Sequence, residues 1–131
     1  MHKTNSKFVN VIACEDVREE IRNKKSLMGV FGGDIVVEEI PAHIWISFYI
    51  EKVPEQPNVP ETVAIEVKHN EKTVGNVTLT FEAPEVATLV MGRALMGVQE
   101  ECILSLTAAV NGGEAEEILS KSVKKGEVQR S

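Results

Sequence analysis

The alternation of apolar and polar positions is most regular between Ile44 and Ile50. These seven residues read Ile-Trp-Ile-Ser-Phe-Tyr-Ile. Successive side chains of an extended strand point to opposite sides, so one face carries the isoleucines and Phe48. The other face carries Trp45, Ser47 and Tyr49. A period of two predicts a strand with at least one buried face.

The same period returns along most of the chain and predicts further strands. They cover residues 7–15 with a continuation from Val17, 26–31, 34–40, 44–52, 62–68, 73–81, 86–98, 101–110 and 115–123. A short helix after Val17 is the alternative there, because Glu and Arg are good helix formers. Within 86–98, Gly92 and Gly97 disfavour a helix and predict a strand, a bend and a second strand.

Turn residues separate these segments. Residues 53–60 hold three of the five prolines and predict a stiff loop, because proline cannot donate to a strand ladder. Residues 69–72 and the Asn-Gly-Gly sequence at 111–113 predict hairpin turns. Eight to nine short strands at this spacing predict an all-β fold, a single-domain β-sandwich rather than a barrel. We expect the sandwich to cover residues 1–123, followed by a flexible C-terminal tail at 124–131.

Composition agrees with one small domain. The chain has 131 residues, 43% of them hydrophobic but only 5% aromatic, so aliphatic side chains must fill a single core. The net charge of −6 disfavours binding to nucleic acid, whose phosphates carry the same sign. The longest apolar runs are too short for a transmembrane helix, so no membrane partner is expected.

The two cysteines, Cys14 and Cys102, are expected to be buried free thiols of a reduced, cytoplasmic protein. Val-Ile-Ala-Cys at residues 11–14 is similar to a lipoprotein cleavage box. The apolar run before it is too short for a signal sequence, so we predict a first strand there instead.

The stretch Cys-Glu-Asp-Val-Arg-Glu-Glu from Cys14, with the Lys-Ser-Leu-Met-Gly-Val-Phe segment that follows and the run to Pro41, resembles the opening of a bacterial domain-of-unknown-function family. The specific part covers about a fifth of the chain. The resemblance implies a small immunoglobulin-like sandwich without a signal peptide. That family carries no assigned activity, so no functional residue is transferred.

Catalytic and metal-binding patterns are missing from the sequence. The three histidines, His2, His43 and His69, have no ligand spacing, and neither cysteine belongs to a Cys-x-x-Cys pair. The acidic and basic residues between 15 and 22 alternate in sign, as on a solvated face. We therefore expect no catalytic residue, no metal and no cofactor.

The sequence leaves two interpretations open for Trp45 and Tyr49, the only Trp and the only Tyr. If their face is exposed, two neighbouring aromatic side chains make an adhesive patch of the kind that anchors interfaces. If both faces of the strand are covered, the two residues belong to a second core layer.

Two functional hypotheses follow. The first is a non-catalytic intracellular binding module that contacts a protein partner, or itself as a homo-oligomer, through a sheet face or an edge strand. The alternative is a homo-oligomer that sequesters an anionic metabolite or nucleotide, for which Arg18, Arg22 and Arg93 would supply the positive charge.

Overall fold

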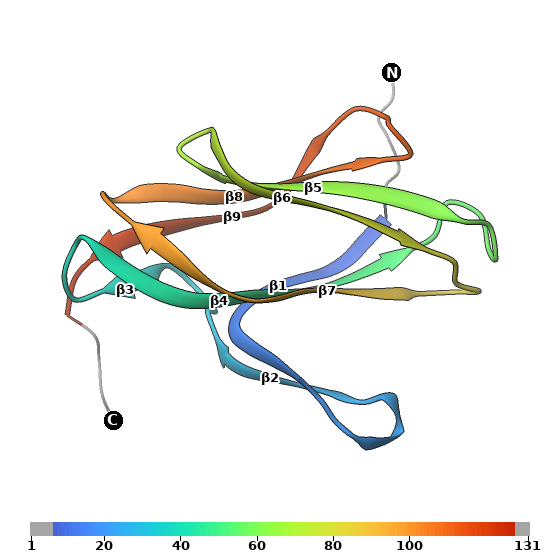
Figure 1. The fold of residues 1–131 in the computed structure, drawn as a ribbon, viewed down its shortest axis with the longest axis horizontal. Helices are drawn as coiled ribbons and strands as arrows, with labels where there is room; N and C mark the ends of the chain where they lie inside the picture. The colour runs from blue at the N-terminus through green and yellow to red at the C-terminus, as the bar shows by residue number, and fades with distance from the viewer. Residues whose placement is uncertain (1–6, 128–131) are drawn as a thin grey trace.

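A computed structural model of the chain describes residues 7–127 as nine strands and one short 3-10 helix, arranged in two layers (Figure 1). In chain order these are β1 (Lys7–Glu19), η1 (Ile21–Asn23), β2 (Lys25–Val30), β3 (Ile35–Val37), β4 (Ala42–Val53), β5 (Glu61–His69), β6 (Lys72–Phe81), β7 (Ala87–Val98), β8 (Cys102–Val110) and β9 (Glu116–Lys125). The predicted all-β fold, a two-layered sandwich, is confirmed.

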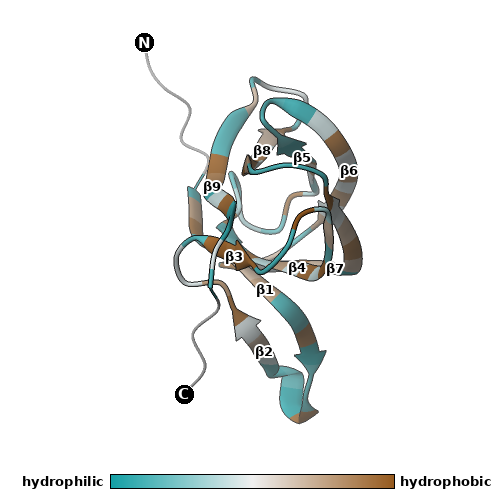
Figure 2. Cartoon of the chain, turned by 90° about the vertical axis from the view of Figure 1, so that its left-hand side faces the viewer, coloured by the Kyte–Doolittle hydropathy of each residue, from teal (hydrophilic) through white to brown (hydrophobic). Residues whose placement is uncertain are grey.

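The strands form one four-stranded and one five-stranded sheet. Their orders are β2-β1-β4-β7 and β3-β9-β8-β5-β6. Neighbouring strands are antiparallel, except that β3 runs parallel to β9. Figure 2 shows the two layers end-on, with β6 and β7 at the same side of the sandwich. Each sheet buries one face against the other, as the period of two requires.

The core lies between the inner faces. On β4 the predicted inner residues Ile46, Phe48 and Ile50 are buried, and Ile44 packs against the core while remaining partly exposed. The opposite sheet contributes Ile65 and further buried aliphatic residues: Val63, Leu104, Leu106, Ala108 and Val123. The alternation in the sequence therefore identifies the buried face of β4 correctly.

Both predicted hairpin turns are present. Asn70 and Glu71 join β5 to β6, and both have positive φ, at 49° and 71°. Such two-residue turns match the right-handed twist of the strands that they connect, and Asn tolerates the left-handed conformation. Asn111 (φ 51°) and Gly112 (φ 75°) make the corresponding turn after β8. The Oδ1 atom of Asn111 also accepts a hydrogen bond of 2.9 Å from the Thr62 backbone N–H.

The prediction of a strand, a bend and a second strand for residues 86–98 is wrong. One strand, β7, covers the segment and pairs with β4 along its whole length. Ala94 lies opposite Ile46 and Met91 opposite Phe48, so two residues of β7 face Ser47 alone. This β-bulge inserts one extra residue and bends the strand without ending it, which is why the glycine at position 92 does not break the element.

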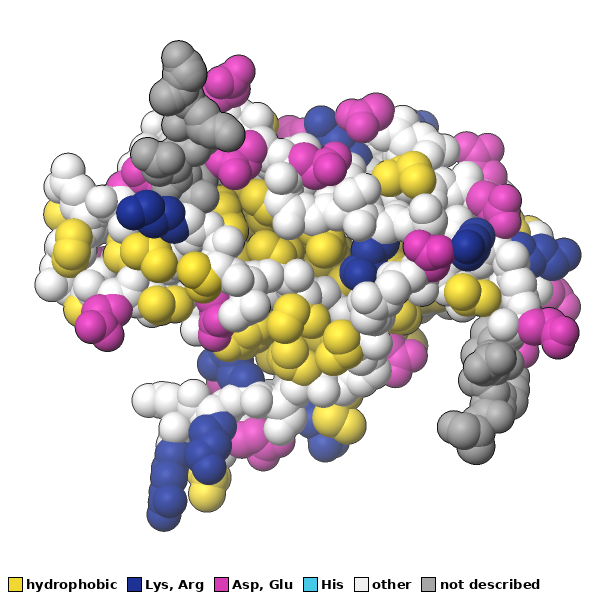
Figure 3. All heavy atoms as spheres, turned by 180° about the vertical axis from the view of Figure 1, so that it is seen from behind, with side chains coloured by type: hydrophobic (Ala, Val, Ile, Leu, Met, Phe, Trp, Pro, Cys, Tyr) yellow, Lys and Arg dark blue, Asp and Glu magenta, His cyan; other side chains and the backbone are white. Residues whose placement is uncertain are grey.

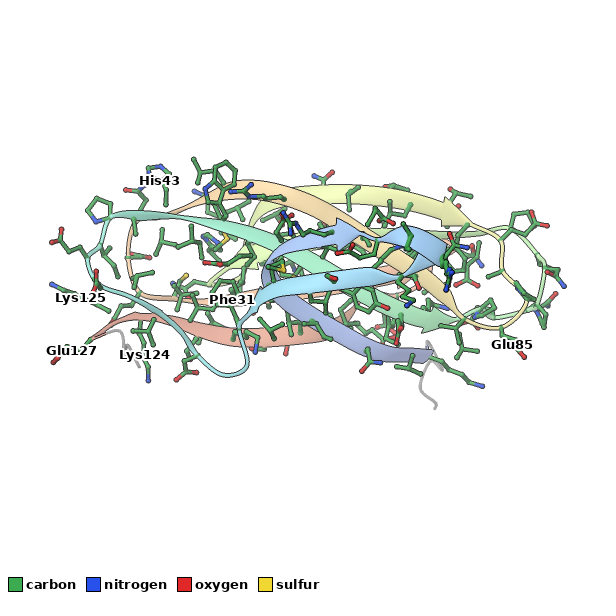
Figure 4. The ribbon with its side chains drawn as sticks, turned by 90° about the horizontal axis from the view of Figure 1, so that it is seen from below. Phe31, His43, Glu85, Lys124, Lys125 and Glu127 are labelled. Carbon is green, nitrogen blue, oxygen red and sulfur yellow. The ribbon has the colours of Figure 1, made fainter. Side chains whose placement is uncertain are left out.

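Strand β9 extends to Lys125, so the predicted boundary between the sandwich and a tail at residue 124 is wrong. The parallel ladder with β3 continues through Lys124 and Lys125, and the Gly126 N–H then donates to the Val37 carbonyl at 3.0 Å. Figure 4 shows Lys124, Lys125 and Glu127 at the same end of the sandwich as His43. Residues 128–131 lie outside the described part of the chain.

The outer half of β1 and strand β2 form an arm of the four-stranded sheet that projects beyond the two packed layers (Figures 1 and 2). The helix alternative for the residues after Val17 is wrong, because this stretch pairs with β2 as far as Glu19. Arg22 and Asn23, both with positive φ, reverse the chain at the tip. Basic side chains gather at this tip in Figure 3, where Arg22 and Lys24 lie.

A buried ion pair joins the two sheets at one end of the sandwich. The Lys52 Nζ atom of β4 lies 2.5 Å from Glu61 Oε2 of β5, with side chains 0% and 2% exposed. Lys52 also donates to its neighbour's carbonyl, the Val53 O atom at 3.0 Å, and its ammonium lies 5.6 Å from the centre of the Phe8 ring. The other oxygen of Glu61 accepts the Glu55 backbone N–H at 2.7 Å. The pair thus fastens the proline-rich loop to both layers.

We expect Lys52→Met to lower the free energy of unfolding by about 3–5 kcal/mol, because it leaves the Glu61 carboxylate buried without its counter-charge. Urea unfolding of the purified protein measures the change. The double variant Lys52→Met/Glu61→Gln should regain part of the loss. Lys124→Met, which breaks the exposed pair with Asp34, should change stability little and serves as the control. A loss in Lys52→Met no larger than in this control would contradict the assignment.

Candidate functional site

Trp45 lies exposed on the outward side of the four-stranded sheet. Its side chain is 45% exposed, and the guanidinium carbon of Arg93 lies 4.1 Å from the centre of its ring system. At this distance the Arg cation stacks on the aromatic face. Arg93 can reach Trp45 because the bulge of β7 falls beside this part of β4. Trp45 is therefore not part of a second core layer.

A crease runs between Trp45 and the arm. Six residues line it and enclose about 270 Å³: Glu15, Asp16, Arg18, Met28, Trp45 and Arg93. Cys14 and Ser47, which lie opposite each other on β1 and β4, are completely buried. The arm, by bending away from the sheet, supplies one wall of this crease and the sheet supplies the other.

Tyr49 shares the outward face of β4 but is engaged in a polar network. Its hydroxyl donates to Glu51 Oε2 at 2.6 Å, and the Asn10 amide donates to the other Glu51 oxygen at 2.6 Å. The hydrogen bond to Glu51 raises the pKa of Tyr49, and the same bond lowers the pKa of Glu51. Trp45 and Tyr49 therefore differ: the Tyr49 hydroxyl is held in a polar network, whereas Trp45 is 45% exposed and its ring contacts the Arg93 guanidinium.

Exposed apolar side chains surround Trp45 on this face. Leu95 of β7 is the cross-strand neighbour of Trp45 and is 52% exposed. Met28 and Val30 of the arm are also exposed, at 44% and 52%. We call Trp45, Leu95, Met28 and Val30 the outer patch. Large apolar residues that gather on one sheet face are typical of an interaction surface.

The structure brings together two of the three arginines that the sequence offers for anion binding. Arg18 and Arg93 both line the crease, whereas Arg22 lies at the far tip of the arm. Glu15 and Asp16 line the same crease and offset the two positive charges. Anion binding by Arg18, Arg22 and Arg93 stays a prediction.

Sequence reasoning missed an apolar groove of about 330 Å³ between the edge strands β6 and β7. Its lining includes the apolar side chains of Phe48, Val67, Met91 and Met96. His69 also lines the groove, and its Nε2 atom lies 3.1 Å from the Met96 sulfur. Burial lowers the pKa of His69, because the charged imidazolium is disfavoured there. A usable signal was the scarcity of charge in the two edge segments, which hold only Lys72 and Arg93.

Within residues 7–127, no group of three or more His, Cys, Asp or Glu side chains is arranged to hold a metal ion. His43 lies exposed at the start of β4, and His2 lies outside the described residues. Cys14 and Cys102 are buried free thiols, as predicted. No helix in the described part of the chain is long and apolar enough to span a membrane.

No protein-family model and no curated protein matches the chain. The resemblance of the segment from Cys14 to Pro41 to a domain-of-unknown-function family therefore stays a prediction.

We expect the stability of the protein to fall as the pH decreases from about 7.5 to 5.5, through the ordinary histidine pKa near 6.5. The pKa of His69 is lower in the folded than in the unfolded chain, so protons bind preferentially to the unfolded chain in this range. Urea unfolding at several pH values measures the slope. His69→Gln should flatten it. An unchanged slope in His69→Gln would show that His69 is not its source.

Both cysteines should resist thiol reagents in the folded protein at neutral pH. Burial raises the pKa of Cys14 and of Cys102, and the thiolate is the reactive form. Labelling with an aromatic disulfide reagent should proceed only as fast as the chain opens and should become rapid in denaturant. Fast labelling of either thiol without denaturant would contradict the burial of that residue.

Proposed function

We propose that the chain is a non-catalytic binding module that contacts a protein partner, or a second copy of itself, through the exposed surface of its four-stranded sheet. The observation that carries the proposal is the exposed ring of Trp45 at the centre of the outer patch. Tryptophan and arginine are the residue types most enriched among the side chains that dominate binding energy at interfaces. Here the two types are already stacked on each other.

The geometry of the patch supports a protein partner. The Trp45–Arg93 stack lies between apolar side chains of the sheet and of the arm, while the acidic residues Glu15 and Asp16 lie beside Arg18 in the crease. An apolar centre with mixed charges at its margin is the usual arrangement of a protein–protein contact. A pre-stacked arginine also loses little side-chain freedom when a partner binds.

The alternative, a homo-oligomer that sequesters an anionic metabolite or nucleotide, has weaker support. Arg18 and Arg93 share the crease and could face an anion. The two carboxylates of Glu15 and Asp16 would repel it, and the accessible aromatic face is stacked on Arg93. A soluble phosphate-bearing ligand would have to displace that stack, so we favour the protein partner.

Affinity capture with three versions of the protein tests the proposal: wild type, Trp45→Ala and Ile103→Ala. Ile103 is a matched control, since it is 46% exposed but belongs to β8 in the other sheet. We expect wild type and Ile103→Ala to retain a common protein from an extract of the native host, and Trp45→Ala to lose it. All three should have similar unfolding curves, because neither side chain is in the core.

Equal capture by all three versions would show that the outer patch is not the contact surface. If Trp45→Ala still captures the protein but added nucleoside phosphates prevent the capture, the sequestering hypothesis would be favoured instead. A thermal-shift series with nucleoside phosphates distinguishes these cases, because a bound ligand stabilises the folded protein.

A further inference from the structure

Strand β7 is a long edge strand without the usual protection. It covers Ala87–Val98 and is the terminal strand of its sheet in the described part of the chain. The strand contains no proline and one charged residue, Arg93, whose side chain is stacked on Trp45. Natural proteins protect exposed edges with prolines, with charges that project from the edge or with very short strands. Strand β7 relies only on its bulge.

The middle of β7 is accessible. Four consecutive residues, Gly92 to Leu95, are exposed, including Ala94, which lies opposite the buried Ile46 and lines the groove. By contrast, the edge strand β6 alternates regularly between half-buried and exposed positions from Gly75 onward.

The other two edges are less suited to pairing. Strand β3 has only three residues, too few for a long ladder with a second copy. Strand β2 contains Gly29 at φ 65°, which interrupts its extended geometry. The ladder of β6 with β5 is unbroken over the longer stretch 75–81, but the exposed residues there, Asn76, Thr78 and Thr80, are polar. The exposed apolar residues Ala94 and Leu95 therefore favour residues 93–97 of β7, a stretch that begins in the bulge at Arg93.

This stretch is complementary to itself in one antiparallel register. With the two-fold axis at Leu95, the Leu95 side chains of two copies meet on the outward face. Arg93 of each copy then lies opposite Gly97 of the other, so the two like charges are not juxtaposed. On the inward face Ala94 lies opposite Met96, a small residue against a large one. Cross-strand neighbours share a face and are close enough to contact each other.

We infer that the chain forms a two-fold symmetric dimer in which the β7 strands of two copies pair antiparallel about Leu95. The four-stranded sheets join into one continuous sheet, and the inward side chains of each β7 extend the apolar lining of the other copy's groove. Such an interface uses the same surface on both copies, as a two-fold axis requires.

The dimer rests on the proposed function, because it takes a second copy of the chain as the partner. It leaves the outer patch accessible. Pairing takes place in the plane of the sheet, so the outward ring of Trp45 stays exposed. Because Leu95 is the cross-strand neighbour of Trp45, the two patches of a dimer become one continuous surface across the axis.

Sedimentation equilibrium of the full chain, from micromolar to near-millimolar concentration, tests the dimer. We expect wild type to dimerise, and Ala94→Lys to weaken the dimer roughly tenfold or more, because it places a charge at the paired edge. Ala64→Lys changes an exposed alanine on β5 of the other sheet and should leave the dimer unchanged. A wild type that remains monomeric throughout, or an Ala94→Lys dimer as tight as wild type, would overturn the inference.

A second variant tests the register. Leu95→Cys should form a disulfide-linked dimer under mild oxidation, because the two residues at the axis are direct cross-strand neighbours. Ile103→Cys, at a similarly exposed position on β8, should not, and the buried native thiols should not interfere. If Leu95→Cys forms no more disulfide-linked dimer than Ile103→Cys, the register is wrong. The capture experiment with Trp45→Ala is independent, so a monomeric wild type would remove the dimer without removing the outer patch as a partner site.

Discussion

The buried pair of Lys52 and Glu61 is the constraint around which the sandwich is arranged. A charge on the inner face of a strand is tolerated only with a counter-charge and hydrogen bonds, and both are supplied here from the other sheet and from the loop that joins the two. The pair therefore fixes how β4 and β5 face each other. The apolar groove between β6 and β7 lies toward the other end of β4 and β5, where Ile46 and His69 line it.

This asymmetry concentrates the available surface on one side of the molecule. The groove, the exposed edge of β7 and the outer patch all adjoin residues 91–97, and Leu95 belongs to both the groove lining and the patch. The bulge at Gly92 and Arg93 is the common cause, because it carries Arg93 onto Trp45 and leaves the following residues exposed. A single local irregularity thus shapes both the proposed partner surface and the inferred dimer edge.

The sequence predicts the fold well because alternation and turn chemistry are local. The burial of Ile46, Phe48 and Ile50 and the positive-φ turns at Asn70 and Asn111 all follow from neighbouring residues. The site is harder to predict. Nothing near Lys52 in the sequence indicates that its ammonium is buried, since Glu61 reaches it only after the sheets pack. The bulge in β7 depends on how β7 aligns with β4. The exposure of Trp45 depends on how the arm bends. The function and the family resemblance stay predictions.

The parallel ladder between β3 and β9 has a consequence for how the chain acquires its structure. Strand β3 lies early in the sequence, but its only ladder partner among the described strands is the last one, and Lys121 reaches back across 88 positions to the Gly33 carbonyl. During synthesis the segment around Ile35 therefore cannot pair until almost the whole polypeptide has emerged, and its apolar side chains stay uncovered until then. Contacts between such distant segments slow folding, so completion of the five-stranded layer is expected to be a late event.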